Sequence, residues 1–479
     1  MSQHHARLIT ARIDRLPPTR SVWGLVLLLS IGGFFEVYDL FQMTYLPPGL
    51  IRDGIFHIGS KGMFGLSDQG TLGAATFIGL FIGEMFVARL ADRIGRRTMF
   101  TGSLLLYTAA SLAMCLQSTA AGVIACRLLA GIGVGAELIT IGAFLTELVP
   151  KQIRGRAFAV CFALSYLAMP VLALASWQLI PRAPLGISGW RWVILAGGSG
   201  AIIVCWLQTR IPESPRWLAM QGRAQQAEAV LLAFEHRVVH EFGKPLPAVG
   251  HTNPLVKTMT RASIWGPGYR GRTLMLIAFN AFLSIGFFGF SQWLPTLLAA
   301  RGTPITQSLM YSFVIAFAYP ISPLLAGIFS DRIERKWLIV GAAFGAAAFG
   351  TAFALSSAAA PIILFGLLIT FCNTTLASNA TAYQAEIFPT EIRSRALGFV
   401  HSFGRITGVA ASFIVALILE HLGVPAVFVL IGASMLIVML SIGLFGPRTN
   451  HRSLEELADG IAKQPVSGKA AHTLPLTGR

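Results

Sequence analysis

The sequence predicts an all-α membrane protein with twelve transmembrane helices in two parallel six-helix bundles. Three observations lead to this fold class. The 479-residue chain is 54% hydrophobic and only 12% charged, with a mean hydropathy of +0.67, which is too apolar for a soluble protein of this length. Apolar runs of about 20 residues, the length needed to cross the hydrocarbon layer, recur throughout. The second half of the chain also repeats the first.

The apolar runs give the expected spans in order along the chain. Each lacks the polar punctuation of a loop and is bounded by charged, Pro or Gly residues. The expected spans are 22–46, 69–91, 98–117, 120–148, 155–180, 191–210, 273–299, 307–330, 337–356, 360–387, 396–420 and 424–446.

The distribution of Lys and Arg supports this count, because cytoplasmic loops carry the excess of positive charge. With the N-terminus in the cytoplasm, 30 of the 37 Lys and Arg residues fall on cytoplasmic segments and five on external loops. The other two, Arg127 and Arg405, fall inside spans. The net charge of +16 therefore indicates topology rather than a nucleic-acid partner, and the basic loops can contact anionic lipid. Both termini are expected in the cytoplasm.

Two pairs of segments repeat at an offset of 239 residues. ARLADRIGRR (88–97) matches GIFSDRIERK (327–336), and ELVPKQIRGRA (147–157) matches EIFPTEIRSRA (386–396). Six helices therefore follow six others in the same orientation. The expected organisation is an N-terminal tail (1–21), a first bundle (22–210), a linker with short helices (211–271), a second bundle (272–446) and a C-terminal tail (447–479). Ser214 is expected to cap the first linker helix.

These repeats and three further motifs carry a resemblance to a known family. The motifs are RLLAGIGVG (127–135), PESPRWL (212–218) and RSLEEL (452–457). Along its whole length the chain resembles the major facilitator superfamily, in particular its sugar-porter and organic-ion-transporter branches and their bacterial metabolite–proton symporters. The resemblance implies alternating access between two bundles and a bacterial cytoplasmic (inner) membrane protein. We also expect a monomer.

The repeated loops are the expected cytoplasmic gate, because in this family such loops form charge networks between helix ends. The sequence departs from the family pattern at Ala88 and Glu334, where Gly is usual. The alternative is that these charges only anchor the topology. The expected gate residues are Asp92, Arg93, Arg96, Glu147, Arg154, Arg156, Asp331, Arg332, Glu386, Arg393 and Arg395.

Four acids and two bases lie within the spans, namely Glu36, Asp39, Glu84, Glu137, Arg127 and Arg405. A charged side chain at the bilayer centre costs about 2.5–3.5 kcal/mol, so such residues are functional by default. Because the acids outnumber the bases, some of them should carry a proton part of the time, as a proton carrier must.

Asp39 and Arg127 are the expected ion pair, since both lie in the outer halves of their helices. Aligning SIGGFFEVYDLF (30–41) with SIGFFGFSQWL (284–294) puts neutral residues opposite both acids of the first helix, so folding does not require these acids. The family resemblance implies that Asp39 is the protonation site and Arg127 its partner. Glu36 is a second candidate carrier, and the choice between the two stays open. Glu137 resembles an acid of the metabolite–proton symporters, and Glu84 either joins them or belongs to the gate.

Arg405 is expected to lack a protein partner, because no acid lies at its depth in the tenth or eleventh helix. A buried guanidinium without a partner is costly, and an anionic ligand would satisfy it. The resemblance to organic-ion transporters points the same way, since organic-anion carriers have Arg at this position. The alternative is that Arg405 bonds backbone carbonyls or a gate residue.

Polar and aromatic side chains expected at the midplane are the candidate walls of the substrate site. For each, a helix–helix hydrogen bond or a place in the core is the alternative. The candidates are Tyr38, Tyr166, Asn280, Gln292, Trp293, Asn373, Asn379 and Tyr383.

The resulting hypothesis is a secondary active transporter that takes up a small organic anion together with protons, without a cofactor or metal. A proton–sugar symporter and a proton-driven exporter of drugs or metabolites are the alternatives. An enzyme is not expected, because nine of the ten His lie outside the spans and neither HExxH nor GxSxG occurs.

Overall fold

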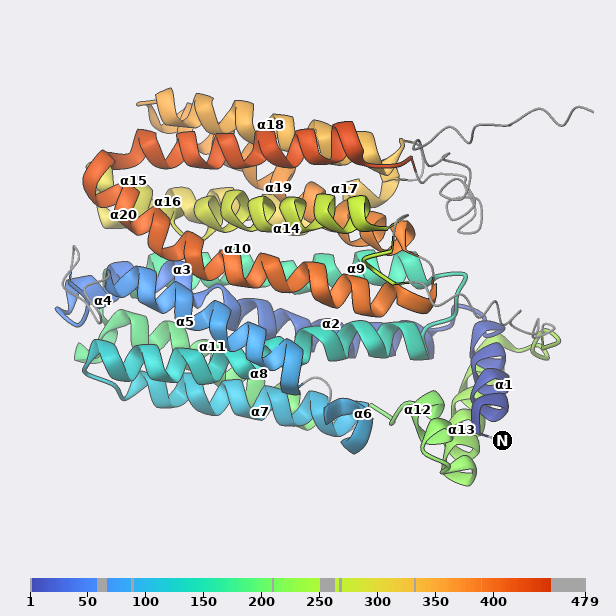
Figure 1. Ribbon diagram of the computed structural model, residues 1–479. Coiled ribbons are helices and arrows are strands. Elements are labelled where there is room, and N and C mark those ends of the chain that lie inside the picture. The colour runs from blue at the N-terminus through green and yellow to red at the C-terminus, as the bar shows by residue number, and fades with distance from the viewer. Residues whose placement is uncertain are drawn as a thin grey trace, which may run out of the picture.

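The computed structural model describes residues 2–57, 67–87, 90–208, 211–249, 263–266, 269–330, 333–388 and 390–448. Within these residues every regular element is a helix, and the long helices lie side by side in two bundles (Figure 1). The polypeptide has no water to bond within a membrane, and a helix satisfies its own backbone groups.

The N-terminal bundle contains the first six spans. Its elements are α2 (Arg20–Leu40) with α3 (Gln42–Tyr45) and α4 (Pro47–Arg52), α5 (Asp68–Ile82) with the π-helix η2 (Gly83–Val87), α7 (Arg96–Cys115), α8 (Ala120–Leu148), α9 (Arg154–Tyr166) with α10 (Ala168–Leu179), and α11 (Gly189–Gln208). The short α6 (Ala91–Ile94) precedes α7.

The C-terminal bundle contains the other six spans. Its elements are α14 (Arg270–Ser291) with α15 (Leu294–Ala300), α16 (Ile305–Ala316) with α17 (Ala318–Ser330), α18 (Arg335–Leu355), α19 (Ala359–Ile387) and α20 (Thr390–Phe445). The backbone of α20 leaves helical geometry at Gly423, where φ is +78°, and the helix turns back there into two arms that diverge from one corner (Figure 1).

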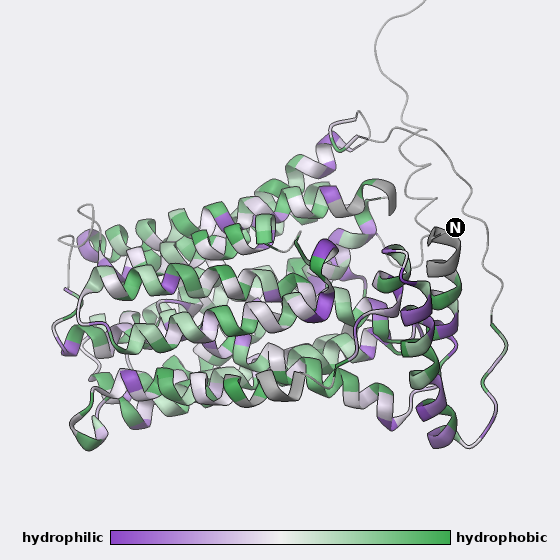
Figure 2. Ribbon diagram, turned by 90° about the horizontal axis from the view of Figure 1, so that it is seen from below, coloured by the Kyte–Doolittle hydropathy of each residue, from purple (hydrophilic) through white to green (hydrophobic). Residues whose placement is uncertain are grey.

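The expected spans agree closely with these helices. Ten helical stretches of the described chain are long and apolar enough to cross a membrane. One of them, Arg395–Phe445, contains two spans because it reverses at Gly423, and α11 lies beside α7 as a further span. Apolar residues run along both bundles, and hydrophilic ones gather on the helices beside the N-terminus (Figure 2).

Helices α5 and α8 approach closely through glycines on both sides. A methyl group on Gly79 or Gly83 would overlap the backbone of α8, and one on Gly131 or Gly135 would collide with the backbone of α5. Small residues of this kind let transmembrane helices pack backbone to backbone. The RLLAGIGVG motif thus fixes α8, and with it Arg127, against α5.

Three helices form a unit at the end of the bundles where the N-terminus lies (Figure 1): α1 (Ser2–Asp14), α12 (Pro215–Met220) and α13 (Ala224–Phe242). The Ser214 hydroxyl accepts a hydrogen bond from Trp217 N at 3.2 Å, which confirms the predicted cap of α12. The N-terminal segment expected only as a polar tail contains a helix, because Arg12 bonds Glu228 and Glu235 of α13 at 2.5 Å. Asp14 also pairs with Arg154 at 3.1 Å, which ties α1 to the start of α9.

The two bundles contact each other along their length. Helix α10 packs against α16, α5 against α20, and α9 against α17. The Gln69 amide of α5 and the Thr296 hydroxyl of α15 exchange hydrogen bonds of 2.9 and 3.1 Å. Residues on these faces are therefore the ones that rearrange when the bundles rock.

Candidate transport site between and within the bundles

Asp39 and Arg127 form a buried ion pair inside the N-terminal bundle. Arg127 Nη1 donates to Asp39 Oδ2 at 2.9 Å, Nε to the Thr76 hydroxyl at 3.0 Å, and Nη2 to the Leu40 carbonyl at 3.3 Å. The Arg127 side chain has no exposed surface and that of Asp39 only 5%. The predicted pairing is confirmed, and its role in proton coupling stays a prediction.

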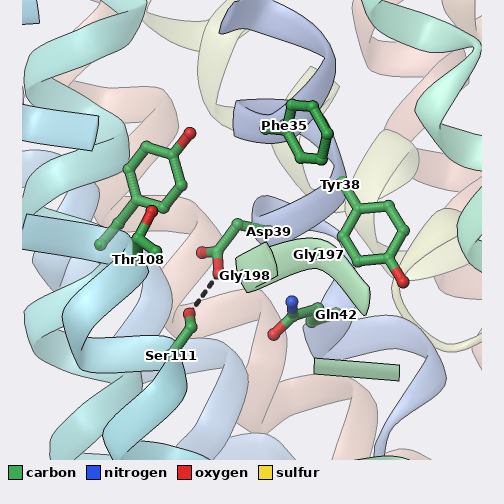
Figure 3. Close-up of a pocket in the computed structure, with 9 residues that line it drawn as sticks. Phe35, Tyr38, Asp39, Gln42, Thr108, Ser111, Gly197 and Gly198 are labelled. Atoms are coloured by element: carbon green, nitrogen blue, oxygen red, sulfur yellow. Dashed lines mark hydrogen bonds between the residues drawn. The ribbon is translucent and has the colours of Figure 1, made fainter. Parts of the chain in front are cut away.

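A small pocket lies on the other side of Asp39 (Figure 3). It is about the size of one water molecule and is lined from α2, α3, α7 and α11. The Ser111 hydroxyl donates to Asp39 Oδ1 here, whereas the Thr108 hydroxyl and the Gln42 side-chain oxygen have no hydrogen-bond partner in the described chain. These polar groups give the Asp39 carboxylate a polar neighbourhood within the bundle.

Glu36 and Glu137 are buried carboxyl groups without an ion pair among the described residues. Glu36 is 3% exposed and Glu137 is fully buried. Both carboxylate oxygens of Glu137 lack a hydrogen-bond partner. Glu36 lies within electrostatic range of Glu84 and Arg405, and Glu137 within range of Glu36 and Asp39. A buried carboxylate is costly without a partner, so this geometry suits groups that carry a proton.

Arg405 pairs with Glu84, and the expectation that it lacks a protein partner was wrong. Arg405 Nη2 lies 2.5 Å from Glu84 Oε1, and Nε donates to Oε2 at 3.2 Å. The sequence argument looked for an acid only in the second half, but Glu84 comes from the π-helix η2 of the first. The side chains remain 23% and 18% exposed, respectively, so the pair is open to exchange, unlike Asp39–Arg127.

An aromatic layer, defined as Phe41, Phe77, Tyr166, Phe288 and Tyr319, crosses the interface between the bundles. Phe77 meets Phe288 at 4.6 Å between ring centroids, and Tyr319 lies 5.9 Å from Tyr166 and 6.0 Å from Phe41. A methyl group on Gly408 would lie 2.8 Å from the Phe77 ring, so this layer begins one turn beyond Arg405 on α20. The sequence analysis found only Tyr166 of this set, because 33 Phe residues give no signal for which ones face the interface.

Gln292 and Asn373, two other candidates for the wall of the substrate site, are buried polar residues. Gln292 lies against Gly73 of α5, and its amide nitrogen has no hydrogen-bond partner in the described chain. Asn373 is 2% exposed, and its side-chain oxygen is likewise unpartnered. Their contact with a substrate remains a prediction.

The remaining candidates make contacts inside one bundle, which is the alternative given for each of them, and their contact with a substrate stays a prediction. The Tyr38 hydroxyl donates to the Val193 carbonyl of α11 at 2.8 Å, and the Tyr383 hydroxyl to the Pro447 carbonyl at 2.8 Å. Asn280 donates to Gln384, Asn379 to the Thr375 carbonyl of its own helix, and Trp293 lies in the core of the C-terminal bundle. Helices that are apolar all round do not reveal in sequence which face points inward.

Three of the expected gate residues, Arg96, Glu147 and Glu386, form ion pairs within their own halves of the chain. Arg96 Nε lies 3.5 Å from Glu147, and Glu386 pairs with Arg335, which the sequence analysis did not select. Glu213 accepts from the backbone N–H groups of Arg96 and Arg97, where the start of α7 favours a negative charge.

Four of the other gate candidates can be placed. Arg154 bonds Asp14 of α1, whereas Arg93, Arg156 and Arg395 are exposed. Asp331 and Arg332, and the side chains of Asp92 and Arg393, lie outside the described residues. The gate role of the whole set stays a prediction.

Comparisons with known proteins agree with this architecture. Residues 25–460 match the family model described as "Sugar (and other) transporter". The chain is 32% identical over 448 residues to YyaJ of Bacillus subtilis (strain 168), which is named for metabolite transport, with 92% of this chain and 96% of that protein covered. It is 26% identical to the niacin transporter NiaP of Acinetobacter baylyi, over 94% of this chain and 99% of that protein.

The fold is similar to that of the Escherichia coli xylose transporter XylE in a partially occluded, inward-open conformation. The TM-score is 0.73 at 18% identity, covering 90% of this chain and 99% of that chain. At this identity the match supports the fold alone. The family match and the relatives are transport proteins, so this multi-pass membrane protein is a transporter and not an enzyme. The chain belongs to the Sugar (and other) transporter family, and its fold is that of the major facilitator superfamily.

Proposed function

We propose that the protein takes up a small organic anion together with protons, by alternating access across a bacterial inner membrane with both termini in the cytoplasm. The observation that carries the proton coupling is the surplus of buried acids: Asp39 is paired with Arg127, whereas Glu36 and Glu137 are buried without an ion pair in the described chain. In the proposed cycle Asp39 or Glu36 receives a proton from the exterior. A proton on Asp39 would weaken its bond to Arg127 before the bundles rock.

The anion part of the proposal rests on Arg405 at the bundle interface. Its guanidinium forms two bonds with a carboxylate and is partly exposed, which is the geometry that an organic acid needs. The aromatic layer next to it offers surfaces for a flat ring. NiaP is named a niacin transporter, and niacin is a carboxylate on an aromatic ring, so ring carboxylates are the substrates to test first.

Uptake by proteoliposomes tests this function. Labelled nicotinate, benzoate and an aliphatic acid such as lactate are offered with and without an inward proton gradient. We expect ring carboxylates to accumulate only with the gradient. Accumulation that ignores the gradient would remove the proton coupling.

A proton–sugar symporter is the second candidate, favoured by the family described as "Sugar (and other) transporter". Gln292, buried at the interface with an unpartnered amide, could bond a sugar hydroxyl. Labelled xylose and arabinose in the same assay separate the two, since uptake of a neutral sugar without any carboxylate transport would favour this candidate.

A further inference from the structure

Glu84 binds Arg405 in the way that the carboxylate of a free ligand would bind an arginine. Glu84 comes from the N-terminal bundle and Arg405 from the C-terminal bundle, and the two bonds use Nε and Nη2 of one edge of the guanidinium. That is the edge a free carboxylate would use for a bidentate bond. A substrate carboxylate and the Glu84 side chain therefore compete for the same donors.

The backbone that carries Glu84 is a π-helix, η2, which continues α5. Wide turns of this type occur mostly at functional sites. Gly83, the residue before Glu84, lies directly against the backbone of α8. This contact fixes the position of the π turn relative to the N-terminal bundle. When the bundles tilt, Glu84 moves with α8 while Arg405 moves with α20.

The charges facing this pair come from every neighbouring helix. On α20, His401 lies one turn before Arg405 and within electrostatic range of both Arg405 and Glu84. On α2, Glu36 lies within range of the same two groups, and on α8 the nearest acid is Glu137, which faces Glu36. Two acids thus share one arginine, and Arg127 is engaged elsewhere with Asp39.

We propose that Glu84 occupies the anion site on Arg405 in the empty transporter, and that a proton on Glu84 releases Arg405 to the carboxylate of the substrate. This proposal rests on the proposed uptake of an organic anion and adds a second place where a proton acts. The proton comes from water on the side to which the site is open and stays on Glu84 while the substrate is bound. The proton on Glu84 offsets the charge of a monocarboxylate, and the proton on Asp39 or Glu36 adds one net positive charge to each inward transfer.

The exchange makes substrate binding a proton-uptake reaction. Lower pH neutralises Glu84, removes the competitor and tightens binding, so the dissociation constant for nicotinate should rise as pH rises. Where Glu84 is ionised in the empty protein, linkage allows a rise of up to about tenfold per pH unit. Calorimetry of nicotinate binding to the purified full chain, in two buffers with different heats of ionisation, should count about one proton taken up per ligand.

Substitution of the acids identifies the group that takes the proton. We expect Glu84→Gln to bind nicotinate more tightly than the wild type and with no pH dependence, because Arg405 has lost its competitor. Glu235→Gln, a matched carboxyl-to-amide change at an ion pair outside the membrane spans, should keep the proton uptake on binding. If Glu36→Gln abolishes that uptake while Glu84→Gln retains it, Glu36 and not Glu84 receives the proton.

The outcomes separate this inference from the proposed function. Wild-type protein that accumulates nicotinate with protons, but binds it with no proton uptake, would overturn the exchange and leave the function standing. This measurement uses only the wild-type protein, so it tests the proposal even if the Glu84→Gln variant fails to fold. Wild-type protein that neither binds nor transports any of the carboxylates would overturn the proposed function and the exchange together.

Discussion

Two arginine–carboxylate pairs lie within the membrane spans of the described chain, and they differ in what surrounds them. Arg127 and Asp39 come from two helices of one bundle and are sealed from solvent, whereas Arg405 and Glu84 come from different bundles and are partly exposed. Rocking of rigid bundles preserves contacts inside each bundle and changes those between them. The first pair can therefore persist until a proton reaches Asp39, while the second must rearrange whenever the bundles tilt.

The largest expected effect on transport follows from neutralising Asp39, the buried acid of the first pair. Asp39→Asn should reduce proton-driven accumulation of substrate to the level of empty liposomes, because no proton can be gained or lost there. Exchange of labelled for unlabelled substrate across the same membranes should continue, since the bundles can still rock. Gradient-driven accumulation by this variant at the wild-type rate would contradict the role of Asp39.

Removing each arginine in turn should sharpen the contrast in stability. Arg127→Leu leaves Asp39 buried without its partner, and loss of one member of a buried pair costs about 3–5 kcal/mol. Arg405→Leu should cost about 1 kcal/mol or less, because that pair is partly exposed. Thermal unfolding of both purified variants measures the difference, and equal losses would show that the two pairs do not differ as described.

Close packing inside a bundle should resist change more than packing between bundles. Gly135→Ala would push a methyl group into the Leu80 backbone and should cost about 1–3 kcal/mol. Gly142→Ala, on the same helix with nothing within 4 Å, is the control and should be neutral or stabilising. Gly73→Ala meets the side chains of Gln292 and Ser412 across the interface and no backbone, so its loss of stability should be smaller than that of Gly135→Ala in the same thermal assay.

The smallest effect concerns an ion cluster outside the membrane. Burial opposes ionisation of Glu235, but hydrogen bonds from Arg12 and Arg15 outweigh it and lower the pKa of Glu235 below its ordinary value of 4.5. A lowered pKa in the folded state adds stability above the ordinary value, and that stability is lost as pH falls through the folded value. The protection factors of the α1 amides, which compare observed with intrinsic exchange rates at each pH, should therefore fall below about pH 4.5, and Glu235→Gln should remove that change. Protection factors that stay constant with pH in the wild type would contradict it.

The sequence predicted the helices well because each span is a continuous apolar run with charged ends. It also predicted the Asp39–Arg127 pair, since both residues lie at similar depth in helices of the same half. The partner of Arg405 was missed for a physical reason: Glu84 reaches it through a π turn and through contact between bundles, and neither follows from helical periodicity. The hydrogen bonds of Tyr38 and Tyr383 to backbone carbonyls could not be told in sequence from contacts with a substrate, because an all-apolar helix has no polar side to mark its orientation.

The N-terminal helix α1 attaches α12 and α13 to the first bundle. Because Arg12 pairs with Glu235 of α13 and Asp14 pairs with Arg154 at the start of α9, we expect these helices to move with the first bundle as one rigid body. A pair of fluorophores on His236 of α13 and Trp337 of α18 would then report each swing of the transporter as a change in energy transfer. A pair on His236 and Thr98 of α7 would keep a constant separation and serve as the fixed ruler.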